Sequence, residues 1–127
     1  MEKAFQEVGD QFAEKIIRGE FDAARSLLAP WLESAISAKQ LETIVREGQG
    51  KQPAPAEFEL DSNSCELEDL EVDENSPPTH ALPAEITKAN FRQWMVIQFN
   101  DSFDLWMALV EVSGALKIGY LEAASAN

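Results

Sequence analysis

The sequence predicts an α+β domain in which N-terminal helices pack on an antiparallel sheet. The first third of the chain carries apolar residues at helical spacing. The last third carries three apolar segments separated by short polar or glycine-containing breaks. At 127 residues the chain has the size of one domain. We therefore divide residues 1–127 into a helical layer over 2–48, an acidic irregular region over 49–89 and an antiparallel sheet over 90–122.

The first predicted helix spans residues 2–18. Its buried side has helical spacing and consists of Phe5, Val8, Phe12 and Ile16. Gly19 is well placed to end it, because glycine readily adopts the left-handed conformation that follows many helices.

Two further helices are expected before residue 49. One begins near Phe21, and Pro30 limits it, since proline disfavours a helical residue before it. Its apolar side consists of Phe21, Ala24, Leu27, Leu28 and Trp31. The other begins with a capping box of Ser37 and Gln40 and is expected to stop at Gly48. Its buried stripe consists of Leu41, Ile44 and Val45.

The region from 49 to 89 is irregular and acidic. Residues 57–61 alternate apolar and acidic side chains, which predicts an edge strand with one buried side. Residues 66–73 repeat this pattern less regularly. Between Lys51 and Lys88 there are ten acidic residues and no Lys or Arg.

Three long strands are expected over 91–99, 105–112 and 115–121. The two-residue turn Ser113-Gly114 places Val112 opposite Ala115, because such turns determine the register. A symmetric loop over 100–104 would place Phe99 opposite Leu105 and Gln93 opposite Glu111.

Alternation along these strands predicts two apolar faces. The core face would carry Phe91, Met95, Ile97, Phe99, Leu105, Met107, Leu109, Leu116, Ile118 and Tyr120, with Gln93, Glu111 and Glu122 at its margins. The second face is too apolar for plain solvent exposure. We expect a homodimer interface there, formed by Trp94, Val96, Trp106, Ala108 and Val110. The alternative is that the chain's own acidic segment or N-terminal helix covers this face.

The order of these elements resembles the nuclear transport factor 2-like superfamily. The resemblance lies in the opening helix, the junction over 19–24, the segment SLLAPWL over 26–32 and the closing strands over 94–99 and 106–112. It implies a cone-shaped fold, in which helices close a strongly bent antiparallel sheet, with a pocket in the cone and dimerisation through the sheet. It does not imply one reaction, because the superfamily includes isomerase-like enzymes, cyclases, adaptors and immunity proteins.

Gln93, Glu111 and Tyr120 are the expected ligand-binding residues, because the predicted register places them on the core face. A carboxyl group in an apolar cone has a raised pKa and can act as a base. One alternative is therefore an isomerase or cyclase that uses Glu111. We assign no catalytic residue, since no catalytic pair is evident.

The remaining reactive side chains predict no metal site and no cofactor. His80 is the single histidine and Cys65 the single cysteine, so a zinc site of the usual composition cannot be assembled within the chain. Cys65 has acidic neighbours that raise its pKa. The run from Asp61 lacks the glycine and glutamate of a calcium loop at its sixth and twelfth positions.

The net charge of -13 argues against nucleic acid as a partner. No apolar run is long enough for a membrane helix, and the cytoplasm is the expected location. We expect a non-catalytic domain that dimerises and binds a small apolar ligand or a protein. A further alternative is an acidic inhibitor or immunity-type protein that binds a basic target through residues 57–74.

Overall fold

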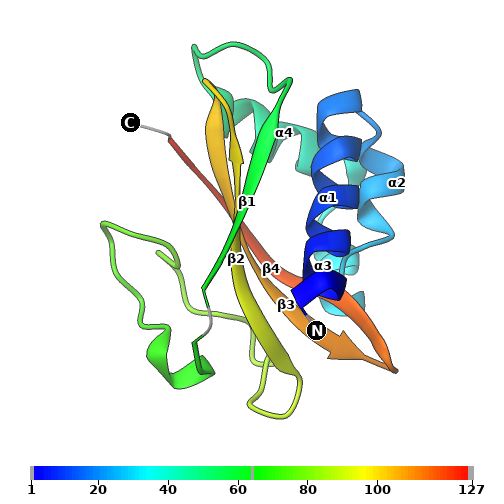
Figure 1. Cartoon of the computed structure of the whole chain (residues 1–127), viewed down its shortest axis with the longest axis vertical. Helices are drawn as coiled ribbons and strands as arrows, with labels where there is room; N and C mark the ends of the chain where they lie inside the picture. The colour runs from blue at the N-terminus through cyan, green and yellow to red at the C-terminus, as the bar shows by residue number, and fades with distance from the viewer. Residues whose placement is uncertain (1, 64, 126–127) are drawn as a thin grey trace.

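The computed structural model describes residues 2–63 and 65–125, and their architecture is α+β, as predicted. The N-terminal helices lie on one side of a four-stranded antiparallel sheet of order β1-β2-β3-β4 (Figure 1). The helices are α1 (Glu2–Arg18), α2 (Phe21–Arg25), α3 (Pro30–Ala35) and α4 (Ala38–Gln49), with a 3-10 turn η1 (Leu67–Asp69). The strands are β1 (Phe58–Asn63), β2 (Phe91–Phe99), β3 (Phe103–Val112) and β4 (Ala115–Ser125).

The predicted second helix, which begins near Phe21 and is limited by Pro30, does not form as one element. Helix α2 ends at Arg25, and Pro30 begins α3 at the first helical position, where its missing N–H costs nothing. Between them the backbone pairs with the sheet. The Ile118 N–H donates to the Leu27 carbonyl and the Ala29 N–H donates to the Ile118 carbonyl, each at 2.8 Å.

Helix α4 begins as predicted but ends later. Ser37 and Gln40 form the capping box. The helix continues to Gln49, and Gly50, with φ of 56°, follows its last turn. Gly48 therefore does not stop the helix. It lies inside α4, where a β-carbon would meet the Ala123 side chain at 2.8 Å and that of Phe103 at 2.9 Å.

The β2–β3 register differs from the prediction by two residues. Ile97 lies opposite Leu105, and Gln93 lies opposite Leu109 rather than Glu111. The cause is the loop, because β3 begins at Phe103 and only residues 100–102 connect the strands. A shift of two keeps each side chain on its predicted face. A bulge between Phe91 and Gln93 is the exception, and Phe91 packs in the second face.

A second bulge changes the faces of β4. The pairs Val112–Ala115 and Leu109–Ile118 form as predicted, but Tyr120 lies opposite Ala108 rather than Met107. Gly119 is the extra residue in β4. Because one inserted residue inverts the alternation, Tyr120 and Glu122 lie on the second face and Leu121 joins the helix-side core.

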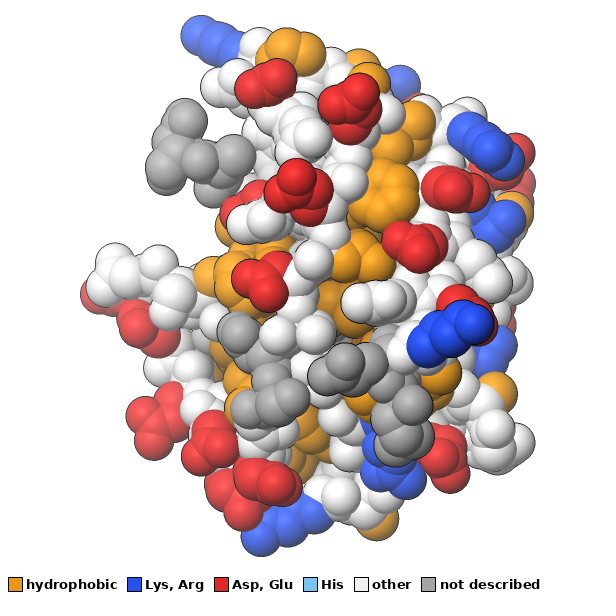
Figure 2. Space-filling view, viewed as in Figure 1, with side chains coloured by type: hydrophobic (Ala, Val, Ile, Leu, Met, Phe, Trp, Pro, Cys, Tyr) orange, Lys and Arg blue, Asp and Glu red, His pale blue; other side chains and the backbone are white. Residues whose placement is uncertain are grey.

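Both faces of the sheet are buried within the single chain. The helix-side core joins α1, α2 and α4 to side chains such as Phe99, Leu105 and Ile118. On the other face, residues 65–86 cross the sheet and contribute Leu67, Leu70 and Ile86 to a second core. Figure 1 shows the two coverings on opposite sides of the sheet, and Figure 2 shows acidic side chains gathered over the segment that follows β1.

Candidate functional site

The structure does not bring the predicted ligand-binding residues together. Gln93 is buried opposite Leu109, and its amide makes one long hydrogen bond of 3.4 Å to the Trp94 carbonyl. Glu111 is exposed and forms an ion pair with Arg92 at 3.6 Å. Tyr120 lies on the opposite face from the one expected. The shifted register and the β4 bulge separate the three side chains.

The expected interface residues lie under the chain's own covering segment. Trp94, Val96, Ala108 and Val110 are buried, and Trp106 is half-buried. The Trp94 ring stacks between Trp106, at 5.7 Å between centroids, and Tyr120, at 6.2 Å. The chain's own acidic segment therefore covers this face, which was the alternative to a dimer interface. Of these five side chains, only that of Trp106 is partly accessible to a second copy.

A cluster of polar groups instead surrounds Glu122. The Thr79 N–H donates to Glu122 Oε1 at 2.9 Å, and the Thr79 hydroxyl donates to Oε2 at 2.6 Å. The Tyr120 hydroxyl also donates to Oε1. The Glu122 cluster, meaning Thr79, Tyr120 and Glu122, ties the covering segment to β4 across 43 residues of sequence.

These contacts shift the pKa values of both titratable members. Burial raises the pKa of Glu122, but the hydrogen bonds from Thr79 and Tyr120 outweigh it and the net pKa is below the ordinary value. Burial and the neighbouring carboxylate raise the pKa of Tyr120 well above its ordinary range. Glu122 is therefore a stable anion that accepts three hydrogen bonds, and Tyr120 is a poor acid. The cluster is suited to holding charge rather than to transferring protons.

The Glu122 cluster borders a cleft between α4 and the end of β4, with a volume of about 420 Å³. We call it the α4–β4 cleft, and its lining residues are Ile44, Glu47, Gly48, His80, Leu121, Glu122 and Ala123. Gly48 lets the helix approach Ala123 closely, which sets the width of the cleft at this end.

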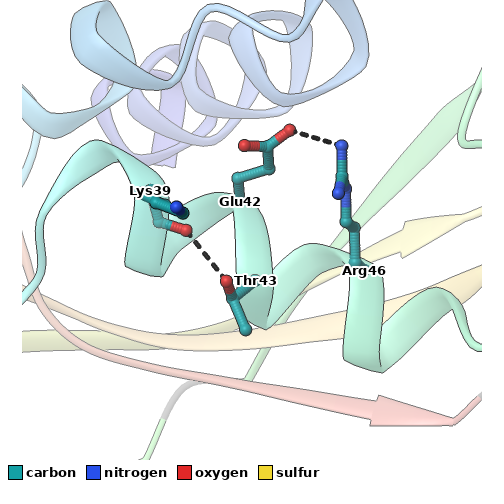
Figure 3. Close-up of polar contacts among 4 residues, drawn as sticks. All are labelled: Lys39, Glu42, Thr43 and Arg46. Atoms are coloured by element: carbon teal, nitrogen blue, oxygen red, sulfur yellow. Dashed lines mark hydrogen bonds and ion pairs between the residues drawn. The ribbon is translucent and has the colours of Figure 1, made fainter.

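The charge of the α4–β4 cleft is negative. Glu47 is exposed, Glu122 is held as a carboxylate, and no lining residue is Lys or Arg. The nearest basic side chain in sequence, Arg46, donates to the Glu42 carboxylate at 2.8 Å (Figure 3). Its charge is therefore already paired along α4.

Sequence reasoning missed most of this cleft. Thr79 and Glu47 carry no local signal, and the predicted register placed Glu122 at the margin of the wrong face. The glycine in β4 was the available clue, because a glycine inside a strand often marks a bulge. With the bulge at Gly119 included, alternation alone would have moved Tyr120 and Glu122 together to the second face.

A separate depression of about 340 Å³ lies beside the end of β2 and is lined by Cys65, Glu66, Asp69, Arg92 and Gln93. Burial, followed by the charges of Asp69 and Glu66, raises the pKa of Cys65. Its thiol is therefore a weak nucleophile at neutral pH.

The described residues form neither a metal-ligand cluster nor a membrane-spanning helix. Across residues 2–63 and 65–125, no three His, Cys, Asp or Glu side chains are placed to hold a metal ion together. No helix in the same ranges combines the length and apolar composition of a membrane span.

Comparisons with known proteins found no match. No protein-family model matches the chain, and no match was found among curated proteins or solved structures. The functional conclusion therefore depends on the geometry and charge of the α4–β4 cleft.

Proposed function

We propose that this chain is a non-catalytic binding domain of the nuclear transport factor 2-like type, whose α4–β4 cleft binds a basic protein partner. The supporting observation is the cleft itself, which places the Glu47 and Glu122 carboxylates on one opening with no Lys or Arg in its lining. A cationic side chain entering this cleft would meet two negative charges.

The wider charge distribution favours the same class of partner. The ten acidic residues between Lys51 and Lys88 are all exposed. Within the described residues, the one ion pair that involves them joins Glu68 to Lys88 at 3.3 Å. A surface with this excess of unpaired negative charge raises the rate of encounter with a basic protein.

The geometry gives less support to an isomerase or cyclase that uses Glu111. A general base needs an enclosed site in which its proton acceptor faces the substrate. Glu111 is instead exposed and paired with Arg92. Gln93, its expected partner, lies opposite Leu109.

The test is binding of matched peptides to the intact chain. A lysine-rich peptide, its uncharged glutamine counterpart and its glutamate counterpart would be titrated by calorimetry at low and high salt. We expect binding of the lysine peptide alone, weakened by salt because the charges lie near the surface.

Glu47→Gln should weaken this binding about two- to fivefold, the range for one exposed charge pair, and Glu47→Lys should weaken it further. The control for Glu47→Gln is Glu7→Gln on α1, which makes the same change in net charge at a position away from the cleft. Equal affinities for Glu47→Lys and the wild type would show that the cleft is not the binding site.

A further inference from the structure

We propose that the partner binds the α4–β4 cleft as an extended basic segment, which adds to the outer edge of β4 as a fifth strand. This inference depends on the proposed function and specifies its binding mode. Its basis is the exposed backbone edge of β4 together with the carboxylates beside it.

The outer edge of β4 is hydrogen-bonded to the segment over 27–31 at one end and lacks such backbone partners among the described residues at the other. Leu27 and Ala29 bond to the backbone of Ile118, and the Trp31 indole donates to the Gly119 carbonyl at 2.9 Å. Among the described residues, no backbone hydrogen bond from outside the sheet reaches residues 121–125. Pairing with β3 nevertheless continues to Ser125, so this end of β4 is extended. An extended edge presents alternate N–H and C=O groups to a further strand.

The two edges of the sheet differ in their protection. At the other edge, β1 carries the exposed acidic residues Glu59 and Asp61, and charges on an edge strand discourage further pairing. The open end of β4 carries Ala123 and Ala124, which are small and uncharged. Its one charged residue, Glu122, is held by Thr79 and Tyr120.

The α4–β4 cleft lies along this open edge. Leu121 and Ala123 pack with the helix-side core, whereas Glu122 lies on the opposite face. Neighbouring residues of an added strand would point to these two sides in turn. Each side has its own carboxylate, Glu47 on α4 and Glu122 on β4. An added strand with adjacent basic residues could therefore pair with both.

The same charges disfavour a second copy of this chain as the occupant. Pairing β4 with β4 would bring two Glu47 and two Glu122 side chains together and would join two molecules of net charge -13. Like charges placed together at an interface oppose association. A basic segment has the complementary charge and can use the same backbone groups.

The experiment compares the affinities of three lysine peptides for the intact chain. The parent has ten residues, with pairs of adjacent lysines among threonines and valines. Two variants carry backbone N-methyl groups at either the odd or the even positions. Only alternate N–H groups of an added strand face the sheet. We therefore expect one variant to lose about tenfold or more in affinity, as several backbone hydrogen bonds are lost, and the other to bind like the parent.

Amide exchange supplies a second readout. Alternate amides within residues 121–125 should gain protection when the parent peptide binds, and amides of β1 should not. Equal binding by both N-methylated variants, or binding without protection in β4, would overturn the fifth strand and leave the proposed function standing. Failure of the parent peptide to bind would refute both. A dimer whose β4 amides are protected without peptide would show that a second copy occupies the edge.

Discussion

Glu122 is the residue on which the covering of the second face depends. Its carboxylate accepts hydrogen bonds from the backbone and side chain of Thr79 and from Tyr120. The aromatic ring of Tyr120 in turn stacks on Trp94. A single side chain thus joins the covering segment, the end of β4 and the aromatic core beneath.

Glu122→Gln should lower the free energy of unfolding by about 1–2 kcal/mol, because hydrogen bonds to a charged acceptor are stronger than those to an amide. Urea unfolding at pH 7 measures the change. Glu111→Gln removes an exposed carboxylate from the neighbouring strand and should change stability by less than about 0.5 kcal/mol.

The stabilisation by Glu122 should also depend on pH. Because the pKa of Glu122 is lowered in the folded state, the unfolded chain takes up its proton first as the pH falls. The contribution is complete above about pH 5 and is lost below the ordinary glutamate pKa of about 4.3, toward the folded value. Burial raises the pKa of Asp104, so the contribution of Asp104 to stability changes with pH in the opposite direction.

Asp104 contributes equally to the stability of both proteins. Its contribution therefore cancels in the difference between the unfolding free energies of the wild type and Glu122→Gln. The two stability curves, measured by urea unfolding between pH 3 and pH 7, should therefore converge at the acidic end. Curves that stay parallel would mean that Glu122 does not carry the lowered pKa.

At the scale of elements, α4 can pack closely on β4 because Gly48 has no side chain. Gly48 faces Ala123 and Phe103 at distances that leave no room for a methyl group. Glycine inside a helix costs about 1 kcal/mol relative to alanine, so packing must compensate for it. The close approach of α4 also forms one wall of the α4–β4 cleft.

Gly48→Ala should therefore destabilise the protein by about 1–3 kcal/mol, as overpacking a core does, although alanine favours the helix. The measurement is thermal or urea unfolding. Thr43→Ala, on the exposed face of the same helix (Figure 3), should be neutral or slightly stabilising. A stabilised Gly48→Ala protein would show that α4 and β4 are further apart than described.

At the scale of the whole molecule, the sheet is covered on both faces by one chain. The helices cover one face, and the acidic segment, which bears exposed carboxylates on its outer side, covers the other. This arrangement leaves the sheet edge rather than the sheet face open to a partner. It also separates the apolar core from the exposed carboxylates of the outer surface.

Trp106→Glu tests this arrangement directly. Placing a charge beneath the covering segment, beside the Trp94 ring, should cost about 2–4 kcal/mol, since burial of an unpaired charge adds to the lost aromatic packing. Unfolding experiments give the stability, and light scattering gives the mass, which should not change. Trp106→Phe is the conservative control. A wild-type dimer that becomes a stable monomer in Trp106→Glu would instead identify this face as a homodimer interface.

The chain's local patterns predicted the elements well and the site poorly. Helix α1, the capping box of α4, the edge strand β1 and the three long strands follow from spacing and turn residues, which are local properties. The Ser113-Gly114 turn also determined the first pairs of β3 and β4. The predicted Gln93–Glu111 pair was wrong because loop length, which no local pattern specifies, sets the β2–β3 register.

The sequence by itself determined the α+β class, the order of the elements and the large excess of negative charge. Only the tertiary structure decided that Tyr120 and Glu122 lie on the second face, beside Thr79 from a distant segment. The physical reason is that one extra residue in β4 inverts the side-chain alternation beyond it. That bulge is accommodated by packing of Gly119 against Val110 on the neighbouring strand and against Trp31, which is 88 residues away in the chain.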